Sequence, residues 1–79
     1  MEIIIYSKDN CSNCQKVKNK LSKYNPKILL LGKNFTREEF FKKFPNIKTV
    51  PQVVIDNKHI GGYKDLEKWL AFKNSSEYF

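Results

Sequence analysis

The chain has 79 residues and a net charge of +7, so we expect one small domain over residues 1–79, near the lower size limit for a single hydrophobic core. Its fifteen Lys and Arg residues are scattered rather than gathered in one block, which indicates a solvated basic surface and not a nucleic-acid interface. No apolar run approaches the length of a membrane span, and the N-terminal stretch lacks the features of a secretory signal. We therefore expect no nucleic-acid or membrane partner, and a reducing, cytoplasmic location.

The first elements surround the only two cysteines of the chain. An apolar run from Ile3 to Tyr6 predicts a short buried strand, and apolar residues recur at helical spacing from Cys11 to Tyr24. A Cys-x-x-Cys pair that begins a helix after a strand is typical of a redox-active dithiol, because the positive helix end stabilises the first thiolate. The i, i+3 spacing of Cys11 and Cys14 puts both sulfurs on one helix face, close enough for a disulfide.

Other roles for the pair are disfavoured. A disulfide across two residues closes too small a loop to restrict the unfolded chain much. A structural zinc site takes four ligands, and the chain adds only His59, so we expect no metal unless two chains share it. Cys11, at the exposed helix start with Lys8 upstream, is the predicted nucleophile. Cys14, one turn further along the apolar face, is the predicted resolving thiol.

A parallel β-α-β unit is predicted for the first third of the chain. Asn10 or Cys11 caps the first helix, and Asn25-Pro26 ends it, because the residue before proline avoids the helical region. Residues 27–31 then read as a second, fully buried strand, and the strand–helix–strand connection is expected to be right-handed.

A second helix is marked at both ends. Thr36 and Glu39 form a capping box, Phe35 occupies the staple position before it, and Pro45 stops the helix. Its apolar face is predicted to belong to the core and consists of Phe40, Phe41 and Phe44.

The last third predicts two short strands and a helix. Residues 51–56 read as a third strand, residues 57–58 as a tight turn, and residues 59–61 as a fourth strand in which His59 is a hairpin residue. Gly61-Gly62 begins the final helix, and residues 74–79 are expected to be a frayed tail. The residues at helical spacing in this helix are Leu66, Trp69 and Leu70.

The order β-α-β-α-β-β-α with a dithiol at the first strand–helix junction resembles the thioredoxin-like α/β fold, a four-stranded mixed sheet flanked by three helices. Two further blocks, Lys-Thr-Val-Pro-Gln at 48–52 and His-Ile-Gly-Gly-Tyr-Lys-Asp-Leu at 59–66, resemble the glutaredoxin family closely. The resemblance covers nearly the whole chain and is greatest to compact bacterial and bacteriophage members. The family usually carries Pro and Tyr between the cysteines, where this chain has Ser12 and Asn13.

The resemblance implies a glutathione site and a cis-proline at Pro51, although Pro51 alone could also be a rigid strand start on a sheet edge. Lys8 would meet the glycine-end carboxylate and Val50 would pair with the cysteinyl backbone. Asp65 would take the γ-glutamyl ammonium, or simply stabilise the first helical turn. The implied glutathione-binding residues are Lys8, Asn13, Thr49, Val50, Pro51, Gly62, Lys64 and Asp65.

The implied function is a monomeric, glutathione-dependent thiol–disulfide oxidoreductase acting on protein disulfides and glutathionylated proteins, with ribonucleotide reductase as a family-typical acceptor. One alternative is a dimer holding a 2Fe-2S cluster through Cys11 of each chain and two glutathiones, as in some glutaredoxins that lack the active-site proline. Another is an electron donor reduced by thioredoxin reductase, which the intact Gly-Gly-x-x-Asp block disfavours.

Overall fold

The computed structural model of the chain describes residues 1–76, and side chains as far as residue 72. The predicted order of elements is confirmed, as is the mixed sheet of four strands with three α-helices around it within residues 1–76. The elements are β1 (Ile3–Ser7), α1 (Ser12–Leu21), the short 3-10 helix η1 (Ser22–Tyr24), β2 (Lys27–Leu30), α2 (Arg37–Lys43), β3 (Gln52–Ile55), β4 (Lys58–Gly61) and α3 (Tyr63–Ser76).

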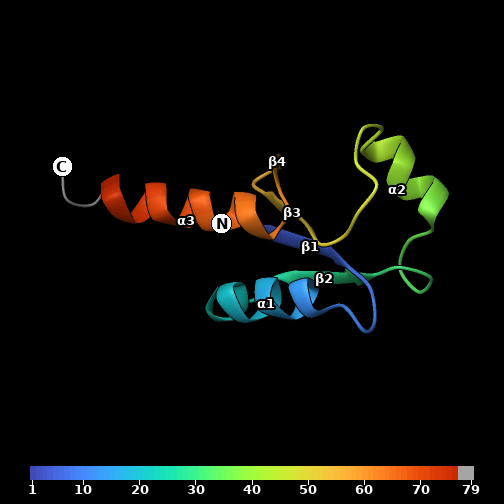
Figure 1. The fold of residues 1–79 in the computed structure, drawn as a ribbon, viewed down its shortest axis with the longest axis horizontal. Helices are drawn as coiled ribbons and strands as arrows, with labels where there is room; N and C mark the ends of the chain where they lie inside the picture. The colour runs from blue at the N-terminus through green and yellow to red at the C-terminus, as the bar shows by residue number, and fades with distance from the viewer. Residues whose placement is uncertain (77–79) are drawn as a thin grey trace.

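The sheet has the strand order β2-β1-β3-β4 (Figure 1). β1 pairs with β2 in parallel and with β3 in antiparallel, so that Ile5 lies between Ile28 and Val53. β3 and β4 form an antiparallel hairpin. β1 and β3 are therefore the central strands, each with a neighbouring strand on both sides. The dithiol follows β1 and Pro51 precedes β3, so both are attached to central strands.

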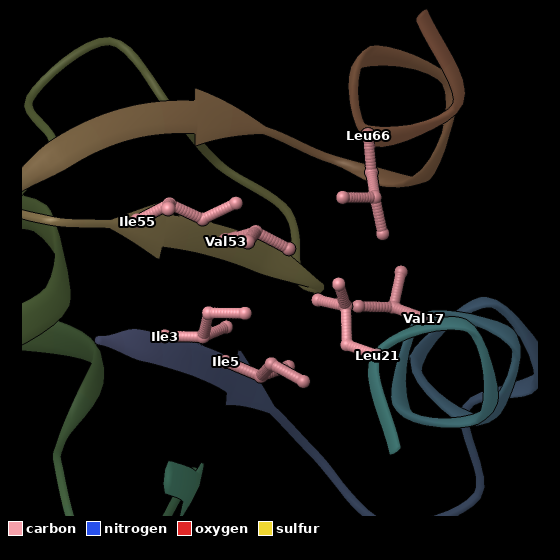
Figure 2. Packing of buried hydrophobic residues seen from close by; sticks show 7 residues of the cluster. All are labelled: Ile3, Ile5, Val17, Leu21, Val53, Ile55 and Leu66. Carbon is pink, nitrogen blue, oxygen red and sulfur yellow. The ribbon is translucent and has the colours of Figure 1, made fainter. Parts of the chain in front are cut away.

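The two faces of the sheet carry separate cores. One core joins β1 and β3 to α1 and α3, and Figure 2 shows these side chains meeting: Ile3, Ile5, Val17, Leu21, Val53, Ile55 and Leu66. The other core is aromatic and lies against α2, which stands apart from α1 and α3 (Figure 1): Tyr6, Phe35, Phe40, Phe44 and Val54. Alternation along the strands, with Ile3 and Ile5 on one face and Tyr6 on the other, explains the division.

Two expectations about burial are wrong. β2 is not fully buried, since Lys27 is exposed and Ile28 is 41% exposed. β2 forms an edge of the sheet, and the first core draws its residues from β1 and β3 instead. Phe41 is 44% exposed, because Phe40 and Phe44 take the inward face of α2.

Several boundaries also differ from the sequence-based expectation. α1 ends at Leu21 and tightens into η1 before Asn25, whose left-handed φ of 51° reverses the chain. The hairpin turns at Asp56 and Asn57, both with positive φ, so β4 begins one residue earlier than predicted, at Lys58.

Two expectations for the second half of the chain also change. Pro51 precedes a central strand, so it is not a strand start on the edge of the sheet. α3 continues to Ser76, so only residues 77–79 of the expected tail remain, and these lie outside the described residues.

The predicted helix signals at α2 are present. Thr36 accepts from the Glu39 N–H at 3.1 Å, and the Glu39 carboxylate accepts from the Thr36 N–H at 2.9 Å. The rings of Phe35 and Phe40 lie 5.6 Å apart, which is the packing expected of the staple positions. Within residues 1–76, none of the helices combines the length and apolarity that a membrane crossing requires.

Candidate active site

Cys11 and Cys14 lie where β1 is connected to α1. Their Cα atoms are 5.2 Å apart and their sulfurs are close to disulfide distance. Cys11 is the N-cap of α1, and its sulfur accepts a hydrogen bond from the Cys14 N–H at 3.2 Å. Such a donor, together with the positive end of the helix, stabilises a thiolate at Cys11.

The two sulfurs differ in exposure. Cys11 is partly exposed and borders a recess with Lys8, Ser12 and Lys18, whereas Cys14 is 1% exposed. Because of this difference in exposure, an incoming disulfide can reach Cys11 but not Cys14. The turn that leads to Cys11 passes through Asn10 at φ 54°, a left-handed conformation that asparagine tolerates well.

The Val50-Pro51 peptide bond is cis, which confirms the prediction. Gln52, the next residue, is only 4% exposed, and both ends of its amide are used. Its nitrogen donates to the Thr49 carbonyl at 3.0 Å, and its oxygen lies 2.7 Å from His59 Nε2. The sequence analysis did not single out Gln52; a lone polar residue beginning an apolar strand was the available signal.

A pocket of about 580 Å³ lies between α1, the loop before Pro51 and the start of α3, a size suited to a small ligand. It brings together five of the predicted glutathione residues: Asn13, Thr49, Gly62, Lys64 and Asp65. The other predicted residues adjoin it. Lys8 and Val50 line a neighbouring pocket that also contains Thr49, and Lys8 borders the recess beside Cys11. Pro51 lies beside Gly62, since a Cβ at Gly62 would lie 3.4 Å from the Pro51 carbonyl oxygen.

Five residues that line this pocket were not among the predicted glutathione-binding residues: Lys16, Ile47, Gln52, Gly61 and Tyr63. Lys16 lies one turn after Asn13 on α1, and its ammonium is 5.4 Å from the centre of the Tyr63 ring. Helical i, i+3 spacing from Asn13 was the signal that could have identified Lys16.

The start of α3 exposes backbone N–H groups that a ligand can approach closely, because Gly62 has no side chain. Leu66 donates to the Gly62 carbonyl, so Gly62 is the N-cap and residues 63–65 form the first turn, whose N–H groups lack partners within the helix. The Asp65 carboxylate accepts from the Gly62 N–H at 3.2 Å. Asp65 therefore stabilises the helix start, and it occupies only one of its two oxygens in doing so. A helix N-terminus of this kind suits a carboxylate ligand.

The part of the chain that the structure describes contains no cluster of side chains suited to bind a metal ion. Nowhere in it do three or more His, Cys, Asp or Glu side chains gather in a way that could hold an ion.

The four-stranded mixed sheet, the dithiol at the first strand–helix junction and the cis-proline before β3 define a thioredoxin-fold protein with a redox-active pair. The glutaredoxin family model matches residues 3–60, and the chain belongs to the glutaredoxin family. The family predicted from the motif blocks is thus confirmed.

Individual relatives agree with this assignment. Glutaredoxin 1 of Rickettsia typhi is 46% identical over 68 residues, covering 81% of this chain and 65% of the relative, so the chain spans slightly less than two thirds of that protein. The structure of reduced Escherichia coli glutaredoxin superposes with a TM-score of 0.75 at 28% identity, covering 95% of this chain and 99% of the other. A buckwheat glutaredoxin–glutathione complex gives 0.73 at 26% identity, covering 90% and 70%.

Proposed function

We propose that the chain is a glutathione-dependent thiol–disulfide oxidoreductase that reduces protein disulfides and glutathione mixed disulfides through Cys11 and Cys14. The observation that carries the proposal is the unequal exposure of two sulfurs at the start of one helix, with Cys11 partly exposed and Cys14 1% exposed. Membership of the glutaredoxin family supports the same chemistry. Its acceptors would be cytoplasmic proteins, with ribonucleotide reductase one family-typical case, and it would act as a monomer.

The reaction moves two electrons through one sulfur pair. The Cys11 thiolate attacks the substrate disulfide, that S–S bond breaks, and one substrate sulfur leaves as a thiol after taking a proton. The Cys14 thiolate then attacks Cys11 Sγ, which releases the second sulfur and leaves the Cys11–Cys14 disulfide. A glutathione thiolate reopens this disulfide at Cys11, and a second glutathione removes the first as glutathione disulfide.

Glutathione would lie across the pocket of about 580 Å³ described above. The backbone of Val50 would pair with its cysteinyl residue, and Lys8 would meet its glycine carboxylate. The first-turn N–H groups of α3 would bind the γ-glutamyl carboxylate, and the second oxygen of Asp65 its ammonium. The glutathione bound to the buckwheat relative supports this choice of ligand.

The proposal is tested with a glutathionylated peptide, glutathione and glutathione reductase. We expect Cys11→Ser to abolish turnover and Cys14→Ser to keep turnover of the glutathionylated peptide while losing that of a protein disulfide. Replacing glutathione and its reductase with thioredoxin reductase should give no turnover. Activity in Cys11→Ser, or efficient reduction by thioredoxin reductase, would contradict the proposal.

A further inference from the structure

The net charge of +7 is not spread evenly over the chain. Residues 10–37, which include Cys11, α1 and β2, contain seven of the fifteen Lys and Arg residues and none of the eight Asp and Glu residues. The other residues contain eight charges of each sign, which cancel. The whole net charge therefore comes from this one segment, although lysines occur along the entire sequence.

Three of these cations form a line along the exposed side of α1 and η1. Lys16, Lys20 and Lys23 are four and three residues apart, the spacing that puts side chains on one helical face, and all three are exposed. The ammonium groups of Lys16 and Lys20 lie 5.4 Å and 5.8 Å from the centre of the same ring, that of Tyr63, so they point to the same side. We call these three lysines the basic stripe.

Local helix energetics do not account for the basic stripe. Like charges four residues apart on a helix repel each other and destabilise it. The helix dipole favours a cation in the last turn, which covers Lys20 but not Lys16. The ammonium of Lys23 lies 5.3 Å from the centre of the Tyr24 ring, a contact that holds the charge in place without neutralising it. The stripe therefore keeps its positive charge for an anionic partner.

The basic stripe leads away from the active site. Lys16 lines the proposed glutathione pocket, whereas Lys20 and Lys23 line none of the three pockets around the dithiol. Lys20 follows Cys11 by nine residues, which places it about 14 Å further along the helix axis. α1 lies at the lower margin of the view in Figure 1, with no other element beyond it. A macromolecule can therefore lie along the stripe while its own sulfur meets Cys11.

Two kinds of polyanion fit a line of lysines, an acidic protein surface and a nucleic acid. Proteins that bind single strands add aromatic faces on which bases stack. The two rings beside the stripe are not available for stacking, because Tyr24 and Tyr63 pack against the first core and carry lysine ammonium groups over their faces. The stripe thus offers charge without stacking, which favours the protein.

We propose that the basic stripe docks an acidic surface of the protein substrate, about 14 Å from the substrate cysteine that reacts with Cys11. Charge complementarity selects this partner, because the stripe lies in a segment with seven cations and no anion. Each exposed ion pair adds little affinity, so the stripe acts mainly by steering and orienting the encounter. This inference rests on the proposed function and names the class of its protein substrates.

The test compares two glutathionylated peptides with the small mixed disulfide of glutathione and β-mercaptoethanol. Each peptide has its cysteine at one end and a flexible linker of six Gly and Ser residues, which spans about 13 Å on average. The acidic peptide ends in four Asp residues and the matched control in four Ser residues. At about 0.01 M salt we expect kcat/KM for the acidic peptide to exceed that of its control by about fivefold. At about 0.5 M salt this preference should disappear.

Two double variants assign this preference to the stripe rather than to the net charge. Lys20→Glu with Lys23→Glu should reduce the preference to about 1.5-fold or less, while reduction of the small disulfide stays within about twofold of wild type. The matched control is Lys42→Glu with Lys58→Glu, at two exposed lysines on α2 and β4. It lowers the net charge by the same amount and should keep a preference of at least about threefold.

Each other outcome overturns the inference. If wild type reduces the small disulfide but shows no preference between the peptides, docking is wrong and the proposed function stands. The same holds if the two double variants lose the preference equally, or if the stripe variant keeps it. If wild type does not reduce the small disulfide, the proposed function fails and the docking falls with it. Binding of a DNA duplex at physiological salt that only the stripe variant loses would assign the stripe to a nucleic acid instead.

Discussion

His59 donates from Nε2 to the side-chain oxygen of Gln52, across a distance of 2.7 Å. The direction follows from the other end of the amide. The Thr49 carbonyl can only accept, so the Gln52 nitrogen, at 3.0 Å, faces Thr49 and the oxygen faces His59. Gln52 thereby ties the loop before Pro51 to β4.

Gln52→Leu removes the donor to Thr49 and should disturb the proposed glutathione site more than the fold. We expect KM for glutathione to rise by about tenfold, and the free energy of unfolding to fall by about 1 kcal/mol for the loss of a part-buried hydrogen bond. The matched variant His59→Ala keeps the bond from Gln52 to Thr49 and should change KM by less than about twofold. Equal KM values for the two variants would show that Gln52 does not position the loop.

Alkylation of the reduced chain should distinguish the two thiols. Cys14 is 1% exposed, so iodoacetamide should modify Cys11 at least about tenfold faster, measured by mass spectrometry of the cleaved peptides. In Cys11→Ser the remaining thiol should stay unmodified until urea unfolds the chain. Rapid labelling of Cys14 in that folded variant would contradict the burial seen here.

Gly61→Ala should destabilise the chain more than Gly32→Ala. Both glycines have positive φ, 124° and 87°, so each substitution strains the backbone. A Cβ at Gly61 would also lie 2.5 Å from an Asp65 carboxylate oxygen, whereas at Gly32 nothing lies within 4 Å. In urea unfolding we expect losses of about 3 kcal/mol at Gly61 and about 1 kcal/mol at Gly32. Similar losses would mean that Asp65 moves aside without penalty.

Thr36→Ala removes one half of the capping box of α2 and should reduce the free energy of unfolding by about 1 kcal/mol. Thr36→Ser keeps the accepting hydroxyl and should stay within about 0.5 kcal/mol of wild type. Urea unfolding followed by circular dichroism measures both. A loss as large in Thr36→Ser would point to the threonine methyl group rather than to the cap.

Leu66→Ala tests the core that supports α3. Leu66 is fully buried, and its truncation should reduce the free energy of unfolding by about 3 kcal/mol. Phe72, on the same helix, is 78% exposed, so Phe72→Ala should change it by no more than about 0.5 kcal/mol. Thermal unfolding of the two variants beside wild type makes the comparison.

Local signals in the sequence located most of the fold and the site. The capping box at Thr36 and the dithiol after a strand depend on residues a few positions apart, so they are readable without the fold. Sheet order is not readable in this way. The Leu-rich run of β2 looks like a central strand, yet its edge position leaves Ile28 41% exposed. Gln52 was missed because its partners come from a loop and from another strand.

Phe41 illustrates the same limit within one helix. Successive residues are about 100° apart around a helix, so Phe40, Phe41 and Phe44 cannot all face one side. Which ones turn inward is decided by the sheet, where Tyr6 packs edge-on against Phe44 at 5.3 Å.

The division of the interior into two cores has a consequence for how such a chain can change. Val17 and Leu21 seat the dithiol helix on one core, whereas Ile47 and Val50 rest on the other, across the sheet. Substitutions on opposite sides of a sheet that share no neighbours combine nearly independently. The packing beneath the dithiol helix and the packing beneath the loop before β3 can therefore change separately, with nearly additive effects on the free energy of unfolding.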